Sequence, residues 1–316
     1  MQQRALTVVM VATYFPYVYI YFVYLFIFIV QWVNRRQIVA ICNEFIVLLQ
    51  LMGTGQNLAW ILRAVLIKHL VLFVKVVLLV IYLSVIVSSD KDWRMWATVT
   101  YWAYIQLVID AITCGYHYVL TVFSKLFQNL NGNLKSDLGF TVDTILHSRR
   151  NISRMCIVSD DIDRIIVLHC RLCNIFKEIN ILYEKQILVS MISRFFHVLI
   201  HVYIAYYTYN TADFDVVAFL YSLCGLSDTL IMSKTCDDLL KHSFLLSDCI
   251  AKSSTYNDLD VRLEQTIEMA SFVLLFKFTR TSVCGLYNIS LGIFLPVLSA
   301  FTSYLFILIQ FASYDQ

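Results

Sequence analysis

Charged residues, proline and glycine are all scarce in this sequence. Only 15% of its 316 residues are charged, whereas soluble domains carry about 25%. The 59% that are hydrophobic exceed what a soluble globule can bury, so the composition argues against a soluble domain and predicts a bilayer as the main solvent. Two prolines and eight glycines offer few of the helix breaks that many inverted-repeat transporters use, so we expect uninterrupted spanning helices.

Catalytic and metal-binding patterns are also missing from the sequence. It contains no His-rich metal motif, nucleophile elbow or phosphate loop, so we predict neither enzyme activity nor a cofactor. The nine cysteines form no framework, and Cys170 and Cys173, beside His169, would need two further ligands to hold zinc. We interpret these thiols as packed on a helix, and we expect no metal and no nucleic-acid partner.

Apolar residues are concentrated in six segments that approach or exceed the length of about 20 residues needed to cross a bilayer. These segments are residues 6–33, 64–87, 95–126, 187–209, 216–232 and 286–311. Residues 127–186 and 234–284 mix charges with apolar positions, which indicates cytosolic helices that extend the spans and pack together as an anchor region. The sequence therefore predicts an all-α, polytopic transmembrane bundle in which residues 1–316 form a single transmembrane domain.

Two short stretches outside the six segments have their own interpretations. Residues 38–52 are apolar but hold Asn43, Glu44 and Gln50, so we interpret them as an interfacial or packed cytosolic helix. Asn131-Gly132-Asn133 has the composition of a turn, so we expect the chain to turn there.

The positive charges are distributed unevenly along the chain. If the first loop is cytosolic, 19 of the 24 Lys and Arg residues, Lys68 among them, lie on that side and three on the other. This asymmetry predicts that both termini face outward. Lys75 and Arg194 fall inside spans: Lys75 should meet a carboxylate or a hydrated cavity, and Arg194 should extend toward the cytosolic interface.

Three motifs occur in order along the chain. The last segment reads Ser303-Tyr304, five apolar residues, then Gln310-Phe311, after a Gly285 that precedes it. Upstream are Leu168-His169-x-x-Leu172-Cys173, followed by Ile179-Asn180-x-x-Tyr183-x-x-Gln186, and Phe127-x-Asn129-Leu130-x-x-x-Leu134. This set, with its hydropathy, resembles the insect gustatory receptors, relatives of the insect odorant receptors. That family has seven spans with a cytosolic N-terminus, so the resemblance implies that the first span is missing here.

The resemblance implies a tastant-gated, non-selective cation channel in the plasma membrane of gustatory neurons, assembled as a homo- or heterotetramer. Gln310 and Phe311 would then form the pore constriction, with Ile307 below and Ser303 on the same helix face. The alternative is that Gln310 bonds to a neighbouring helix near the outer interface. Family sugar receptors tend to carry an acidic residue where this chain has Leu305, so a bitter or otherwise aversive tastant is favoured.

A ligand pocket is marked less clearly in the sequence. Candidates on the predicted outer half are Tyr101, Trp102, Gln106, Tyr203 and Tyr206. Apolar walls with a few polar groups are typical of such sites, but tyrosine and tryptophan also form belts at bilayer interfaces.

His197 and His201 share a helix face, which suits a metal, paired packing or a water-filled cleft.

Other receptor and transport classes fit less well. An odorant receptor-type channel subunit would share the architecture, and the Gln-Phe ending favours the gustatory type. A G-protein-coupled receptor usually carries Asp-Arg-Tyr and Asn-Pro-x-x-Tyr motifs, which this sequence lacks. A transporter is disfavoured by the shortage of glycine and proline and by the lack of visible repeats.

Overall fold

The computed structural model describes the backbone of residues 2–51, 58–89, 93–147, 152–210, 216–253, 261–277 and 279–314. Near several helix ends, including residues 2–17, 137–147 and 311–314, the backbone alone is described.

The described chain is built almost entirely from helices. They are α1 (Gln2–Leu51), α2 (Leu58–Ser89), α3 (Trp93–His147), α4 (Ile152–Asn210), α5 (Val216–Ser253), α6 (Val261–Phe276) and α7 (Leu291–Tyr314). Between α6 and α7 a two-residue strand, β1 (Ser282–Val283), pairs antiparallel with β2 (Tyr287–Asn288). The predicted all-α polytopic bundle is confirmed.

The longest helices, α1, α3 and α4, have 50 to 59 residues and are longer than a bilayer is thick. With 59 residues, α4 is about 90 Å long, whereas a bilayer's hydrocarbon core is about 30 Å thick. Among the described residues, four segments are long and apolar enough to cross a membrane: Val18–Gln50, Ala103–Ser136, Cys156–Tyr203 and Leu291–Gln310. The division into six spans stays a prediction.

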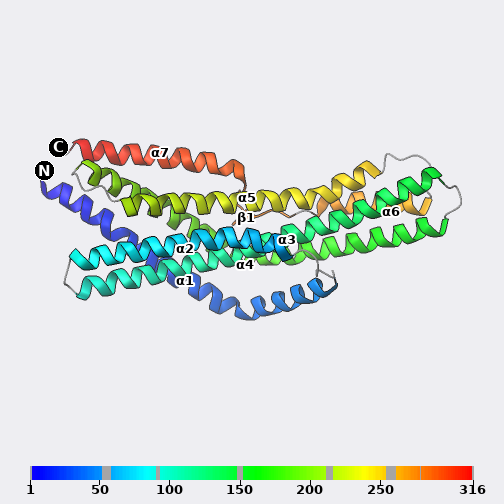
Figure 1. Ribbon diagram of the computed structural model, residues 1–316, viewed down its shortest axis with the longest axis horizontal. Helices are drawn as coiled ribbons and strands as arrows, with labels where there is room; N and C mark the ends of the chain where they lie inside the picture. The colour runs from blue at the N-terminus through cyan, green and yellow to red at the C-terminus, as the bar shows by residue number, and fades with distance from the viewer. Residues whose placement is uncertain are drawn as a thin grey trace.

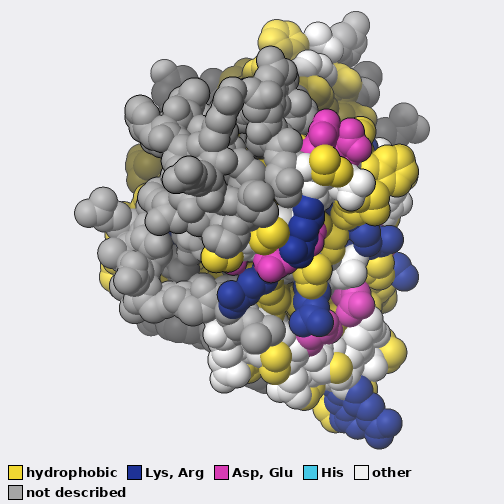
Figure 2. All heavy atoms as spheres, turned by 90° about the vertical axis from the view of Figure 1, so that its right-hand side faces the viewer, with side chains coloured by type: hydrophobic (Ala, Val, Ile, Leu, Met, Phe, Trp, Pro, Cys, Tyr) yellow, Lys and Arg dark blue, Asp and Glu magenta, His cyan; other side chains and the backbone are white. Residues whose placement is uncertain are grey.

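The bundle is elongated, and different sets of helices form its two ends (Figure 1). At one end α1, α2 and α7 lie with α3, α4 and α5, and both termini are found there. Toward the other end only α3, α4, α5 and α6 continue, and we call this part the four-helix extension. Figure 2 looks at the extension end, where Lys, Arg, Asp and Glu side chains are interspersed with apolar ones. One exposed ion pair there joins Arg262 to Asp160 at 2.6 Å.

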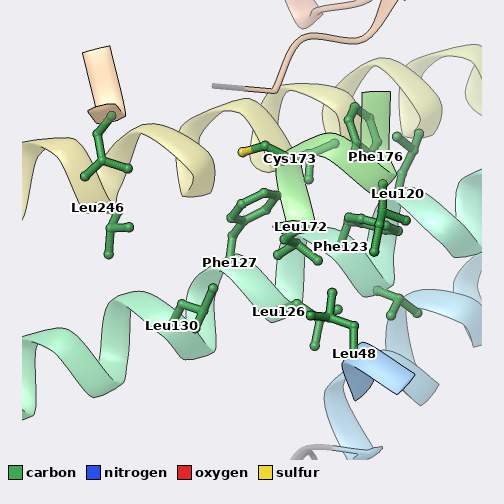
Figure 3. Close-up of a cluster of buried hydrophobic side chains, with 14 of the residues drawn as sticks. Leu48, Leu120, Phe123, Leu126, Phe127, Leu130, Leu172, Cys173, Phe176 and Leu246 are labelled. Atoms are coloured by element: carbon green, nitrogen blue, oxygen red, sulfur yellow. The ribbon is translucent and has the colours of Figure 1, made fainter. Parts of the chain in front are cut away.

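The largest apolar core joins the extension to the rest of the bundle. Phe123 is fully buried and lies between the rings of Phe45 and Phe176, at centroid distances of 5.0 and 5.3 Å. Figure 3 shows how these helices converge on one cluster, with Leu48 from α1 and Leu246 from α5 at its edges.

Residues 38–51 continue from the first predicted span without a break as part of α1, and Ile41 and Leu48 pack in this core.

The turn expected at residues 131–133 is wrong, because α3 runs through it. Leu130 and Leu134 are buried on one face of the helix, and the Asn131 side chain donates a 2.7 Å hydrogen bond to the His242 carbonyl. Gly132 costs about 1 kcal/mol relative to alanine in a helix. The burial of its neighbours offsets that cost.

Replacing Phe123 by alanine should destabilise the protein by about 3–5 kcal/mol, because a buried ring is lost and a cavity remains. Tyr118→Ala is the matched control, since Tyr118 lies on the same helix but is 49% exposed. Thermal unfolding in detergent, followed by intrinsic fluorescence, would measure both variants. Equal melting temperatures for the two variants would contradict this assignment of the core.

The contact between α3 and α5 includes a titratable side chain, His242. The His242 ring shares a 2.8 Å hydrogen bond with the Ser124 hydroxyl, and burial lowers the pKa of His242 below its usual 6.5, with a smaller opposing effect from Asp238. The unfolded chain therefore binds more protons than the folded one just below pH 6.5, so stability should fall as the pH drops through that range. A His242→Gln variant should lose less stability between about pH 6.5 and 5 in the same unfolding assay. Parallel losses in both proteins would show that His242 does not contribute.

Candidate functional site

Five charged side chains meet inside the bundle and form what we call the charge cluster. Lys68 and Lys75 come from α2, Asp110 from α3, Arg194 from α4 and Asp228 from α5. None is more than 7% exposed. Ionisable groups in an apolar span are costly, and they persist there when they pair with one another or serve a function.

Arg194 bridges the two carboxylates of the charge cluster. Its Nη2 lies 3.1 Å from Asp110 Oδ1, and its Nη1 lies 2.5 Å from Asp228 Oδ2. Lys75 Nζ lies 3.4 Å from Asp110 Oδ1 and 3.6 Å from Asp228 Oδ2, and Lys68 pairs with Asp228 Oδ1. The cluster thus links four helices through two carboxylates and three cations, which leaves one formal positive charge in excess.

The structure settles the sequence-based expectations for these cations. Lys75 does meet carboxylates, as predicted. Arg194 does not extend toward an interface, because Asp110 and Asp228 are within hydrogen-bond reach inside the bundle. Lys68, counted with the cytosolic charges, is 2% exposed and belongs to the cluster. The i, i+7 spacing of Lys68 and Lys75 indicated a shared face of α2 and could have suggested a common partner.

Local sequence brings α5 close enough to α4 for these contacts. Gly225 lies three residues before Asp228, and a Cβ atom added to it would come within 2.9 Å of Val198 Cγ2. Glycine therefore permits the approach of the two helices one turn from the ion pair.

The histidine pair on α4 lies close to the charge cluster. The Nε2 atoms of His197 and His201 are 3.0 Å apart, and the Tyr221 ring lies 5.2 and 5.7 Å from the two imidazoles. Among the described residues, no group of three or more metal-binding side chains is found. The two histidines are hydrogen-bonded to each other and packed against Tyr221.

The five predicted pocket residues are in different environments. Gln106 is buried, and its Oε1 has no hydrogen-bond partner. Tyr101 and Tyr206 are exposed, Tyr203 is half-buried, and the side chain of Trp102 lies outside the described residues. Neither of two cavities found among the described residues is lined by any of them. The tastant pocket stays a prediction.

Helix α7 packs against the bundle along one face only. Phe301, Leu305 and Leu308 belong to an apolar cluster with Val198 and Leu199 of α4. The opposite face of α7, which points away from the bundle, is called the outer face. Ser303, Ile307 and Gln310 lie on it and are all exposed. The Phe311 side chain lies outside the described residues.

The hydroxyl groups on the outer face of α7 are bonded to their own helix. Ser303 and Thr302 each donate a 2.9 Å hydrogen bond to the Ser299 carbonyl. Tyr304 is 54% exposed and lies edge-on to Phe195, with ring centroids 6.2 Å apart. The outer face is thus small and polar at several positions, and no helix of the described chain covers it.

Two of the motif residues, Gly285 and Asn180, form or hold the β-hairpin before α7. Cys284 and Gly285 have φ angles of 52° and 69°, a region that glycine adopts readily. Asn180 donates a 2.9 Å hydrogen bond to the Ser282 carbonyl and accepts one of 2.9 Å from the Tyr116 hydroxyl. The Glu184 carboxylate accepts a 3.2 Å hydrogen bond from the Cys284 amide. Helix α4 therefore anchors the connection to α7.

Several other motif residues, among them Phe127, Leu172 and Cys173, lie in the apolar core. His169 is 1% exposed, and its ring centroid lies 5.1 Å from that of Phe127. The Cys173 sulfur lies 3.6 Å from His169 Nδ1 and 3.8 Å from the Lys277 carbonyl oxygen. Leu172 and Cys173 point into the cluster of Figure 3, so this part of the motif is structural.

The apolar, multi-helix bundle with its buried charge cluster defines a polytopic helical membrane protein. Within that class, residues 2–315 match the 7tm chemosensory receptor family, and the chain belongs to this family. None of the curated proteins matches the chain significantly. Membership supports a chemoreceptor role with a small-molecule ligand.

Removing one carboxylate from the charge cluster should be strongly destabilising. Asp228→Asn removes the negative charge that Lys68, Lys75 and Arg194 share in a buried site, at a cost of about 3–5 kcal/mol. Asp160→Asn, which breaks the exposed pair with Arg262, should change little. Thermal unfolding and the yield of monodisperse protein would measure both variants.

The double variant Asp228→Asn with Lys68→Met provides the internal check. Because it restores the original charge balance, it should recover part of the lost stability. No recovery would contradict direct coupling between the two residues.

Proposed function

We propose that this chain is a gustatory-type receptor subunit that forms a tastant-gated, non-selective cation channel in the plasma membrane. The observation that supports this most directly is the uncovered outer face of α7, which carries Ser303, Ile307 and Gln310. An amide exposed on an otherwise apolar span is costly in lipid, and it is satisfied when it meets water. Copies of α7 arranged around an axis would provide such a water-filled path.

The composition of this face suits a gate. Ser299 and Ser303 are small and polar, whereas Ile307 is a branched apolar residue one turn from Gln310. A ring of apolar side chains closes a pore by excluding water, and a neighbouring ring of amides supports ion passage when it widens. In the proposed channel, Gln310 and Phe311 form the constriction, with Ile307 below them.

A second uncovered surface supports assembly into a homo- or heterotetramer. On α6, Met269, Phe272, Leu275 and Phe276 are each 62–71% exposed, whereas Leu263, Ile267, Ala270 and Leu274 are buried. Contiguous exposed apolar residues mark interaction surfaces. Since α6 leads through the hairpin into α7, contacts between α6 helices would bring the α7 helices of different subunits together.

The ligand would act by shifting a population of states. A small molecule bound in the predicted outer half, among Tyr101, Gln106 and Tyr203, favours opening if it binds the open form more tightly. The hairpin held by Asn180 then carries any displacement of α4 to the start of α7. Leu305 in place of an acidic residue favours a bitter or aversive tastant over a sugar.

An odorant receptor-type channel subunit is the main alternative function. It would use the same helices and the same uncovered α7 face. The Gln310-Phe311 ending favours the gustatory type.

The pore assignment can be tested by recording currents from cells that express the chain with a gustatory partner subunit and are exposed to a panel of bitter compounds. Gln310→Ala should change the relative permeability to Na⁺, K⁺ and Ca²⁺ or abolish the current, because it removes the amide from the proposed constriction. Gln50→Ala is the matched control: it removes an exposed glutamine from α1, away from α7. Unchanged conductance and selectivity in both Gln310→Ala and Phe311→Ala would overturn the proposal.

A further inference from the structure

A cavity lies between the side of α4 and the connection that leads from α6 to β1, and we call it the basic cavity. On α4 it is lined by Asn174, Lys177, Ile181 and Glu184, which are three or four positions apart and therefore share one face of the helix. The facing wall comes from residues 276–282. The basic cavity thus joins two segments that are far apart in the sequence.

Positive side chains outnumber negative ones around the basic cavity. Lys177, Lys277 and Arg280 line it, and all three are exposed, so their charged ends can be reached from outside the protein. Glu184 is the one carboxylate among the described lining residues, and it already accepts a 3.2 Å hydrogen bond from the Cys284 amide. Three cations and one carboxylate leave an excess of two positive charges, which favours an anionic ligand.

Lys277 is held in place without losing its capacity to bind an anion. Its Nζ donates a 3.0 Å hydrogen bond to the Asn174 side-chain oxygen, which is uncharged. An ammonium group has three N–H donors, so this bond leaves two of them for a further acceptor. The bond also fixes Lys277 against α4, on the helix that carries Lys177.

The basic cavity lies beside the predicted cytosolic surface of the membrane. Its α4 face ends at Glu184, just before the predicted span 187–209, and Lys177 is about 15 Å from the start of that span along the helix. On the other wall, Arg280 comes shortly before the predicted span 286–311. In Figure 1 this connection meets α7 where the four-helix extension begins, and the charge asymmetry predicts that the extension is cytosolic.

This position selects the kind of anion. The cytosolic leaflet carries the anionic lipids, and basic pockets beside spanning helices on that side suit phosphorylated headgroups. A phosphomonoester carries about −1.5 to −2 charges and three strong acceptor oxygens, which match several lysine and arginine donors at once. Ile181 also lines the basic cavity, is 52% exposed and lies in the candidate membrane span of α4. It gives the site an apolar edge for the start of an acyl chain.

We propose that the basic cavity binds the headgroup of an inositol lipid that carries phosphomonoesters, in the cytosolic leaflet. The phosphates accept hydrogen bonds from Lys177, Lys277 and Arg280. Because one wall is α4 and the other leads to α7, the bound headgroup holds these two segments together next to the bond from Asn180 to the Ser282 carbonyl. Binding does not require channel activity, so it can be measured separately from the proposed function.

The test uses the full chain in phosphatidylcholine nanodiscs, with radiolabelled dioctanoyl phosphatidylinositol 4,5-bisphosphate as the probe and empty nanodiscs as the background. The probe should bind saturably. Dioctanoyl phosphatidylserine, which has no phosphomonoester, should compete at least about tenfold more weakly. Inositol trisphosphate should also compete at least about tenfold more weakly, because without acyl chains it is not concentrated at the membrane. Inorganic phosphate should not compete at the same concentration.

The double variant Lys177→Gln with Arg280→Gln removes one cation from each wall and should weaken probe binding at least about tenfold. Arg171→Gln with Lys185→Gln is the matched control, since both residues are exposed cations of α4 that do not line the basic cavity. The control loses the same charge and should bind the probe within about twofold of the natural protein. Melting temperatures would establish that both double variants fold, and the single variant Lys177→Gln replaces the first one if it does not.

Four results would each overturn this assignment. Equal competition by phosphatidylserine would show general attraction to an anionic surface, and equal competition by inositol trisphosphate would show a site for a soluble polyphosphate. Equal competition by inorganic phosphate would show a small-anion site. Equal losses in the two double variants would show that net charge, and not the basic cavity, binds the lipid.

Discussion

The arrangement of α2, α3, α4 and α5 depends on ion pairing in a region without bulk water. Asp110 and Asp228 each bind Arg194 and at least one lysine, so none of these helices can slide or rotate without exposing a buried charge to apolar surroundings. Apolar packing alone gives a weaker constraint within a bilayer, because lipid tails compete on equal terms with leucine and isoleucine. The charge cluster therefore determines which faces of the four helices meet.

The rest of the molecule is organised around that fixed region. Toward the four-helix extension, the helices are joined by an apolar core built from Phe123, Phe127 and Phe176. Toward the other end, α7 is held along a single face and leaves the opposite face uncovered. The hairpin that Asn180 holds in place joins these two parts. A bundle joined by buried ion pairs, with one helix packed along a single face, suits a receptor that changes state, because elements that move come from the less stable parts of a fold.

Sequence patterns predicted the helices well, but of the three buried cations they predicted only Lys75, and they did not predict the contacts between distant helices. The neighbours of Lys75 in the chain are apolar, so the sequence itself predicts that Lys75 needs a buried partner. Arg194 lies nearer the end of its span, so the same logic allowed it to reach an interface, and only the proximity of Asp110 and Asp228 excluded that. Gly132 was interpreted as a turn because local composition favours one, whereas burial of Leu130 and Leu134 keeps the helix intact. The motif around His169 and Cys173 indicated the protein family. Its structural role, packing in the interior of the bundle, follows only from the tertiary structure.

The sequence by itself determined that this protein lies in a membrane, that it is helical and that its last span carries an unusual glutamine. Those properties follow from composition and from the period of the helix, which are local. Tertiary structure alone decided that three cations share two carboxylates, that α7 has one uncovered face, and that Lys177 and Arg280 line one cavity. These features depend on side chains up to 160 positions apart in the chain, such as Lys68 and Asp228. No local pattern encodes which of them meet, because pairing is set by how whole helices pack.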